Sequence, residues 1–176
     1  PMFEKLKQLI SPDLMTNEVE NESNAVPKAA AMLLLEVAWA DHEIEDSEFA
    51  AIRRALQELY MIDHADVDAL IQQAHNDHKL STGVYPFTRT LNKDLSRKEK
   101  CELLKHLWRL TNFEGDRHHY EEHVIRKITD LLYLNHRDFI TAKLAVLDAD
   151  KNIWSIAEAQ HNFISKRLNT YKCRTD

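Results

Sequence analysis

The chain has 176 residues, a hydrophobic fraction of 44% and a formal net charge of −6 at pH 7. That length suits one compact domain of roughly 100–200 residues, and the hydrophobic fraction is that of a folded core rather than of a disordered chain. The two glycines and four prolines are too few for the many turns of a β-sandwich or barrel, so we predict an all-α fold. The acidic balance disfavours nucleic acid as a partner, because phosphate binding depends on clustered Lys and Arg.

The sequence also bears on where the protein is located. No apolar run approaches the roughly eighteen residues that a membrane-spanning helix needs, so we expect no membrane span. The opening stretch Met2–Ile10 alternates charged and apolar residues, which indicates a short amphipathic helix rather than a secretory signal. Cys101 and Cys173 lie far apart and fit a reduced environment better than a disulfide. A cytoplasmic location is therefore expected.

After the short first helix, a polar linker runs to residue 25. Pro27 then suits the first turn of a helix, where a missing N–H costs nothing. The following run, Lys28–Ala40, is apolar on nearly every face and predicts a helix central to the core. Beyond an acidic stretch, a one-sided apolar stripe predicts a second long helix; the stripe consists of Phe49, Ile52, Leu56, Leu59 and Tyr60.

Capping residues mark the helices that follow. Asp63 is expected to cap a helix over residues 64–78. Residues 87–95 form another predicted helix. Ser96 and Glu99 then have the spacing of a capping box, in which each side chain bonds the backbone of the other residue. The helix that begins there carries Leu103, Leu107 and Leu110.

The sequence resembles itself when it is shifted by seventy-three residues. The aligned pairs are Asp41 with Glu114, Glu48 with Glu121, Ile52 with Ile125, Arg53 with Arg126, Leu59 with Leu132, and Tyr60 with Tyr133. Asn135, with Asp138 three residues later, is expected to cap a helix as Asp63 does. We therefore predict a bundle of about seven to eight helices built from two repeated helix–acidic turn–helix units, over about 27–79 and about 97–147, packed face to face.

Three stretches carry a resemblance to a known family: "ADHEIEDSE", "YPFTRTLN" and "FEGDRHHYEEHVIRKITDLLYL". Over Ala30–Leu147 the chain resembles the tellurite-resistance protein B (TerB) family, whose domain also occurs in the DnaJ-like co-chaperone DjlA. The resemblance implies an all-helical domain, a divalent-cation site at the acidic turns and a scaffold role in stress-response complexes. Two positions depart from the family pattern, because His42 stands in place of Gly and Glu114 in place of Asp.

We therefore expect the chain to have three parts. Residues 1–25 form a short helix and linker, residues 26–147 form the TerB-like domain, and residues 148–176 form a C-terminal helical extension.

The two acidic turns supply four candidate metal ligands, which are Asp41, Glu48, Glu114 and Glu121. Their oxygens suit a hard cation, Ca²⁺ or Mg²⁺, rather than zinc. The same residues also suit solvated helix caps, because an acidic side chain in a helix's first turn contributes typically about 0.3–1 kcal/mol without any ligand. Each turn offers only two well-placed side chains, whereas Ca²⁺ takes about six to eight oxygens. We therefore favour the caps and keep the cation site as the alternative.

Three weaker patterns also occur in the sequence. The segment from Asp148 begins like an EF-hand loop, but Ile153 replaces the required Gly and Ala159 the bidentate Glu, so a helix cap is favoured there. Trp39 and Trp108 are expected to pack in the core. Clustered histidines are interpreted as exposed helix residues: His75, His78, His118, His119 and His123.

The favoured hypothesis is a non-enzymatic interaction and scaffold module of the TerB type, in a stress-response system of the tellurite-resistance kind. It would present two exposed, similarly built acidic turns to another protein. The alternative is a metal-dependent hydrolase or redox enzyme that uses the carboxylates and histidines. That alternative is disfavoured because the sequence offers no plausible nucleophile or open transition-metal site. A homodimer joined through the C-terminal helix is a third option.

Overall fold

The computed structural model describes residues 24–41, 44–111 and 118–151. All regular structure in these ranges is helical, which confirms the predicted all-α fold. None of the helices found there is long and apolar enough to cross a membrane. The predicted helix at Met2–Ile10 and the segment from residue 152 onward lie outside the described residues. The elements are α3 (Ala25–Ala38), η1 (Trp39–Asp41), α4 (Asp46–Tyr60), α5 (His64–Leu80), α6 (Tyr85–Asp94), α7 (Arg97–Arg109) and α8 (His118–Leu131), and a further helix covers residues 136–151.

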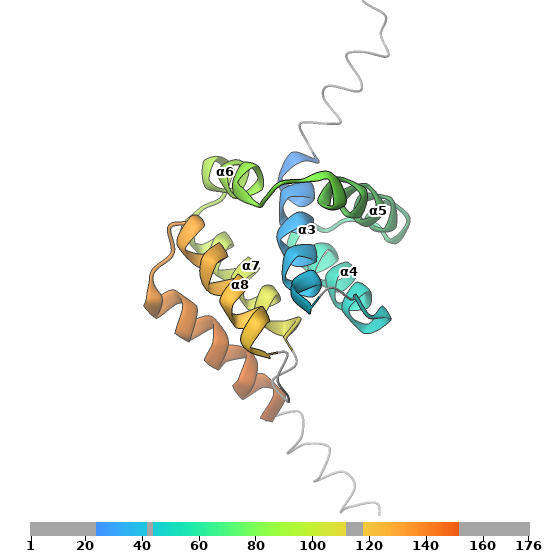
Figure 1. The fold of residues 1–176 in the computed structure, drawn as a ribbon. Helices are drawn as coiled ribbons and strands as arrows, with labels where there is room; N and C mark the ends of the chain where they lie inside the picture. Colours follow the sequence, from blue (N-terminus) through green and yellow to red (C-terminus); the bar gives the residue numbers. More distant parts are fainter. Residues whose placement is uncertain (1–23, 42–43, 112–117, 152–176) are drawn as a thin grey trace, which may run out of the picture.

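Helix α3 is the centre of the bundle (Figure 1). It contacts α4 and α5 on one side, α7 and α8 on the other, and α6 near its first turns. Its sequence is apolar on nearly every face, and the side chains from Ala29 to Leu35 are each at most 2% exposed, as the sequence predicts. Pro27 lies in the first turn, where its missing N–H breaks no helical hydrogen bond. The other helices are therefore arranged around one helix that is buried on every face between Ala29 and Leu35.

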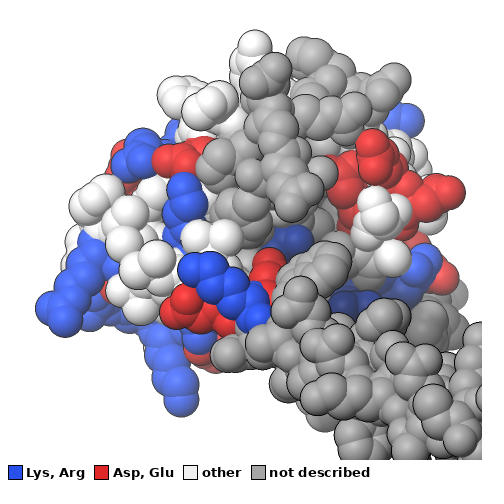
Figure 2. All heavy atoms as spheres, turned by 90° about the horizontal axis from the view of Figure 1, so that it is seen from below, with Lys and Arg blue, Asp and Glu red and all other residues white. Residues whose placement is uncertain are grey.

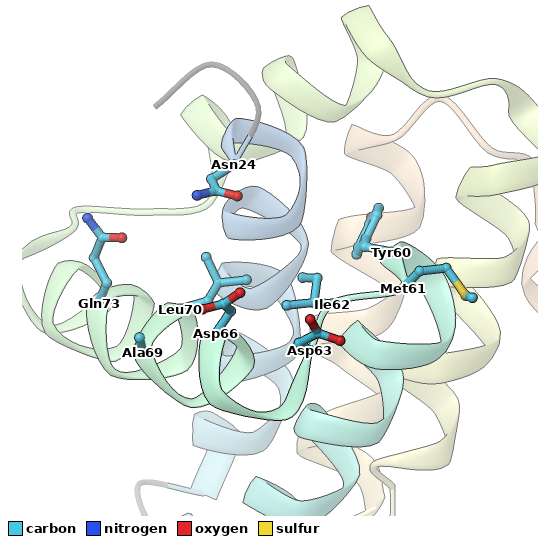
Figure 3. Close-up of a pocket in the computed structure, with 9 residues that line it drawn as sticks. All are labelled: Asn24, Tyr60, Met61, Ile62, Asp63, Asp66, Ala69, Leu70 and Gln73. Atoms are coloured by element: carbon cyan, nitrogen blue, oxygen red, sulfur yellow. The ribbon is translucent and has the colours of Figure 1, made fainter. Parts of the chain in front are cut away.

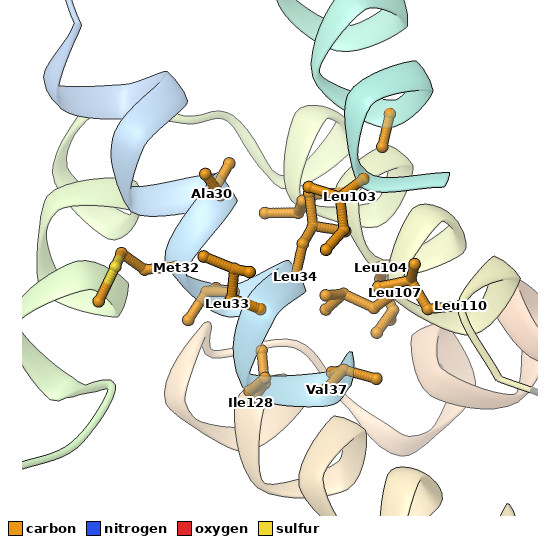
Figure 4. Packing of buried hydrophobic residues seen from close by; sticks show 14 of the residues in the cluster. Ala30, Met32, Leu33, Leu34, Val37, Leu103, Leu104, Leu107, Leu110 and Ile128 are labelled. Carbon is orange, nitrogen blue, oxygen red and sulfur yellow. The ribbon is translucent and has the colours of Figure 1, made fainter. Parts of the chain in front are cut away.

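The interior is a leucine-rich cluster shared by α3, α7 and α8 (Figure 4). Each of its central side chains is 0% exposed, and burying one such side chain contributes about 1.5–3 kcal/mol. The cluster thus joins the first half of the chain to the second. Its central members are Leu33, Leu34, Val37, Leu103, Leu104, Leu107 and Ile128.

The helix over residues 136–151 is attached through aromatic rings. Trp108 of α7 is 0% exposed and meets Phe139 edge-on, with ring centroids 5.0 Å apart, which confirms its predicted core role. The Lys143 ammonium lies 4.9 Å from the centre of the Trp108 ring. Asp148, expected to cap a later helix, instead lies inside this one, because neither glycine nor proline interrupts residues 136–151. The EF-hand-like start is therefore helical.

At two corners of the chain a residue other than glycine has a positive φ. Met61 follows α4 with φ 55°, and Tyr133 follows α8 with φ 57°. Left-handed backbone costs a residue other than glycine about 1–2 kcal/mol. Asp63 follows the first corner and Asn135 the second, each directly before a helix. These corners are built alike, while the similarity of the two complete halves as structural repeats stays a prediction.

The predicted caps occupy their expected positions. The Ser96 backbone N–H donates to Glu99 Oε2 at 2.8 Å. Asn135 and Asp138 bond reciprocally, since each backbone N–H donates to the other side chain at 2.9 Å. Asp63 is the N-cap of α5, but its side chain makes no capping hydrogen bond. The sequence thus placed all three helix starts and overestimated the bonding at one of them.

Replacing Leu34 with alanine should lower the free energy of unfolding by about 2–5 kcal/mol, because a fully buried leucine loses its contacts and leaves a cavity. Chemical denaturation followed by circular dichroism measures this change. Leu80→Ala is the matched control: that side chain is 83% exposed, so its effect should stay within about 0.5 kcal/mol. Equal losses in the two variants would contradict the central burial of α3.

Candidate functional site

The first acidic turn begins where α3 ends. Helix α3 passes directly into η1, which contains Asp41. The side chain of Asp41 and residues 42–43 lie outside the described residues. The chain is described again from Ile44, which packs against the core, and the exposed Glu45 and Asp46 then open α4. Figure 2 shows acidic side chains gathered at one edge of the molecule.

Glu48 caps the helix to which it belongs. Glu45 is the N-cap of α4, and Glu48 is the third helical residue. The backbone N–H of Glu45 donates to Glu48 Oε2 at 2.7 Å. This confirms the predicted placement, and it means that one oxygen of the carboxylate stabilises the helix start without any ligand.

Glu121 lies in the first turn of α8, yet it is only 5% exposed. The expectation that both acidic turns stand exposed is therefore wrong for this residue. Its burial follows from the stripe on α8, because Ile125 and Ile128, four and seven residues later on the same face, are both 0% exposed. That stripe is visible in the sequence and is the signal that predicts a buried position.

Elements from the two halves of the chain meet where η1 contacts α8. The element that contains Asp41 thus meets the helix whose first turn holds Glu121. Glu114 belongs to residues 112–117, which are outside the described residues. The structure thus brings together the elements of two candidate ligands and places Glu48 in a helix cap. In the described part of the chain, no three His, Cys, Asp or Glu side chains gather to hold a metal ion.

His78 of α5 fixes the end of α3 from which the acidic turn starts. Its Nε2 donates to Glu36 Oε2 at 2.7 Å, since a carboxylate can only accept. The His78 ring also lies edge-on to Trp39 of η1, with centroids 6.4 Å apart. An ion pair between Lys28 and Asp77, at 2.6 Å, joins the same helix to the first half of α3. These contacts hold α3 and α5 together and set the direction in which η1 leaves.

The histidines differ in exposure. His75 and His78, expected to be exposed, are half-buried. His75 lies edge-on to Phe49 at 5.9 Å between centroids, and burial lowers the pKa of its imidazole. Their burial follows from packing between α5 and its neighbours, which the sequence pattern of α5 alone does not reveal. His119 and His123 are exposed, as expected.

A separate hollow of about 440 Å³ lies at the corner between α4 and α5, beside the start of α3 (Figure 3). Burial, together with the nearby charge of Glu99, raises the pKa of the Tyr60 phenol in this hollow to about 12. The phenol is therefore protonated near neutral pH and does not act as a base. The sequence singles out Tyr60 and Asp63 for other reasons and does not predict the hollow, because its lining residues become neighbours only through the corner. The lining residues are Asn24, Tyr60, Met61, Ile62, Asp63, Asp66, Ala69, Leu70 and Gln73.

Comparison with known families gives one match. A family model described as "Tellurite resistance protein TerB" matches residues 27–144. Comparisons with curated proteins and with solved structures gave no match. The matched range includes α4 to α8 and almost all of α3, so it covers both acidic turns.

Replacing Glu48 with alanine should lower the free energy of unfolding by about 0.5–2 kcal/mol, the usual effect of losing a helix cap. Glu48→Gln keeps a side-chain oxygen that can accept the same hydrogen bond, so its loss should be smaller. Both variants are compared by chemical denaturation in the presence of a chelator. If the glutamine variant loses as much free energy of unfolding as the alanine variant, the charge of Glu48 rather than its hydrogen bond stabilises the helix.

Glu36 should make stability depend on pH. The hydrogen bond from His78 lowers the pKa of the Glu36 carboxyl below 4.5, and the charges of His78 and Lys127 act in the same direction, although burial opposes them. A lowered folded-state pKa adds stability above the unfolded value, and this stability is lost as the pH falls through the folded value. Wild type should therefore exceed Glu36→Gln in stability near neutral pH, and the difference should shrink below pH 4.5.

Denaturant unfolding near neutral pH and below pH 4.5 measures this difference in stability. Asp130→Asn is the control, because Asp130 is exposed at the far end of α8. A difference between wild type and Glu36→Gln that is the same at both pH values would contradict the role given to His78.

Proposed function

Because the chain belongs to the TerB family, we propose that it is a non-enzymatic interaction and scaffold module of a tellurite-resistance-like stress-response system. Its acidic turns bind a divalent cation, Ca²⁺ or Mg²⁺, and present the resulting surface to another protein. Asp41, Glu48, Glu114 and Glu121 carry this role.

The contact between η1 and α8 is the observation that supports the proposal most strongly. It brings the element of Asp41 to the helix whose first turn holds Glu121, although the two are far apart in the sequence. A carboxylate that is 5% exposed requires hydrogen bonds or positive charge around it. In the proposed site the carboxylates of the two turns repel one another, and a hard cation relieves that repulsion. Binding would therefore tie the two halves of the chain together at this face.

The start of α4 supports the docking part of the proposal. Glu45 and Asp46 are exposed at the start of α4, next to Glu48, which caps that helix. A partner with a basic surface fits this charge, and charge complementarity of this kind guides association and selects partners. A cation bound at the turn would reduce the negative charge and so regulate the docking.

A metal-dependent hydrolase or redox enzyme is the alternative function. Such an enzyme needs a cluster of ligands with an open coordination position. No observation on residues 24–41, 44–111 and 118–151 favours it, since no three metal-binding side chains gather there. The interaction module is thus the function that the described geometry supports best.

Calorimetric titration of chelator-treated protein with Ca²⁺, Mg²⁺ and Zn²⁺ tests the cation site. We expect saturable heat with Ca²⁺ or Mg²⁺, accompanied by a higher melting temperature, because a ligand that binds only the folded state stabilises it. Both effects should disappear in the double variant Asp41→Asn with Glu114→Gln, which removes two carboxylates and keeps the side-chain size.

The control is Asp94→Asn with Asp130→Asn, which makes the same change in charge at two exposed positions on other helix ends. This variant should bind as wild type does. Absence of heat with Ca²⁺ and Mg²⁺ would overturn the cation site and leave a purely electrostatic docking surface. Zinc binding that survives in the double variant would assign the metal to the histidines instead.

A further inference from the structure

A second cleft, of about 230 Å³, lies between α7 and the helix over residues 136–151 (orange in Figure 1). It is at the beginning of α7, whereas the second acidic turn follows the end of α7. One wall consists of three α7 residues spaced four apart, which places them on one helical face. That wall is Arg97, Cys101 and Lys105, and the facing wall is Arg137, Asp138, Thr141 and Ala142.

The cations of this cleft have unused hydrogen-bond donors. Arg97 Nη2 donates to Asp138 Oδ1 at 2.7 Å, but the Arg97 side chain is still 66% exposed. A guanidinium has about five N–H donors, so most of those on Arg97 are available to a ligand. Lys105 pairs with Glu102 at 2.9 Å. Arg137 is exposed and forms no ion pair within the described residues.

The carboxylate in the cleft is already compensated. Asp138 Oδ2 accepts from the Asn135 backbone N–H at 2.9 Å, and Oδ1 accepts from Arg97 at 2.7 Å. Burial acts to raise the pKa of the Asp138 carboxyl, but the bonds from Asn135 and Arg97 outweigh burial and lower it. Each acidic group at the cleft thus has its own partner, and the charge of Arg137 is left over. The cleft is locally positive in a protein with a net charge of −6.

We propose that this cleft binds a small phosphate-type oxyanion, held by Arg97 and Arg137 with help from Lys105. Arginine matches the geometry of such oxyanions with paired N–H donors. The Thr141 hydroxyl adds a neutral donor on the same wall. Both helix starts at this end are capped by their own carboxylates, so side chains rather than backbone N–H groups supply the donors.

The volume of the cleft limits the ligand. Pockets for drug-sized molecules measure about 300–1,000 Å³, and this cleft, at about 230 Å³, is smaller. It therefore fits inorganic phosphate or the phosphate group of a small monoester better than a nucleotide. The inference does not depend on the proposed function, because it uses neither acidic turn.

Cys101 provides a reporter inside the cleft. Its thiol is half-buried there, and burial together with the charge of Asp138 raises its pKa, so the reaction is followed at alkaline pH. In the full chain, Cys173→Ser leaves Cys101 as the single thiol. Inorganic phosphate and glucose 6-phosphate, each at constant ionic strength, should slow alkylation of Cys101 by iodoacetamide in a saturable way. Calorimetry should give the same affinities.

Arg137→Gln should weaken phosphate binding about tenfold or more, the effect of losing a charge-assisted contact. Arg89→Gln, which removes an exposed arginine from α6, is the matched control and should leave the affinity unchanged. Saturation by inorganic phosphate alone supports a site for the free anion. Saturation by both compounds supports a site that also accepts the phosphate group of a monoester. The proposal is overturned if neither compound gives saturation, if sodium chloride protects Cys101 equally, or if Arg137→Gln binds as tightly as wild type.

Discussion

The arrangement of this protein depends on the burial of α3 on every side. An amphipathic helix needs neighbours on one face, whereas α3 needs them all round, because its side chains from Ala29 to Leu35 are at most 2% exposed. Helices from both halves of the chain therefore have to pack on it at once. The leucines of α7 and Ile128 of α8 complete the same cluster that α3 begins. A change inside α3 is felt by both halves, since they share one core rather than two.

The same burial determines where the acidic turn lies. α3 is held by α5 through the bond between His78 and Glu36, and its continuation η1 contacts α8 on the other side. The first acidic turn thus follows a helix end that contacts elements from both halves of the chain. One of these elements is α8, whose first turn holds the buried Glu121.

The sequence predicted the local features well and the long-range ones poorly. The caps at Ser96 and Asn135 and the placement of Glu48 depend on residues three apart, so spacing alone was enough. The burial of Glu121 depends on packing against other helices. Predicting it would have meant following the stripe that Glu121 shares with Ile125 and Ile128, rather than assuming that a charged residue is exposed. The cleft at Arg97 and Arg137 was not predicted, because it forms from two helices about forty residues apart. Fold class and helix starts are thus encoded locally, and sites between helices are not.

The two left-handed corners show what this packing permits. Met61 and Tyr133 are 87% and 81% exposed, so neither side chain is held in place by neighbours, and each still adopts a backbone that ordinary residues avoid. The conformation belongs to the connection itself, because each corner leaves only a few residues between two helices. The residue type at these two positions can therefore vary, because the exposed side chain makes few contacts. The length of the connection cannot vary, because an added or deleted residue would rotate the following helix away from the core.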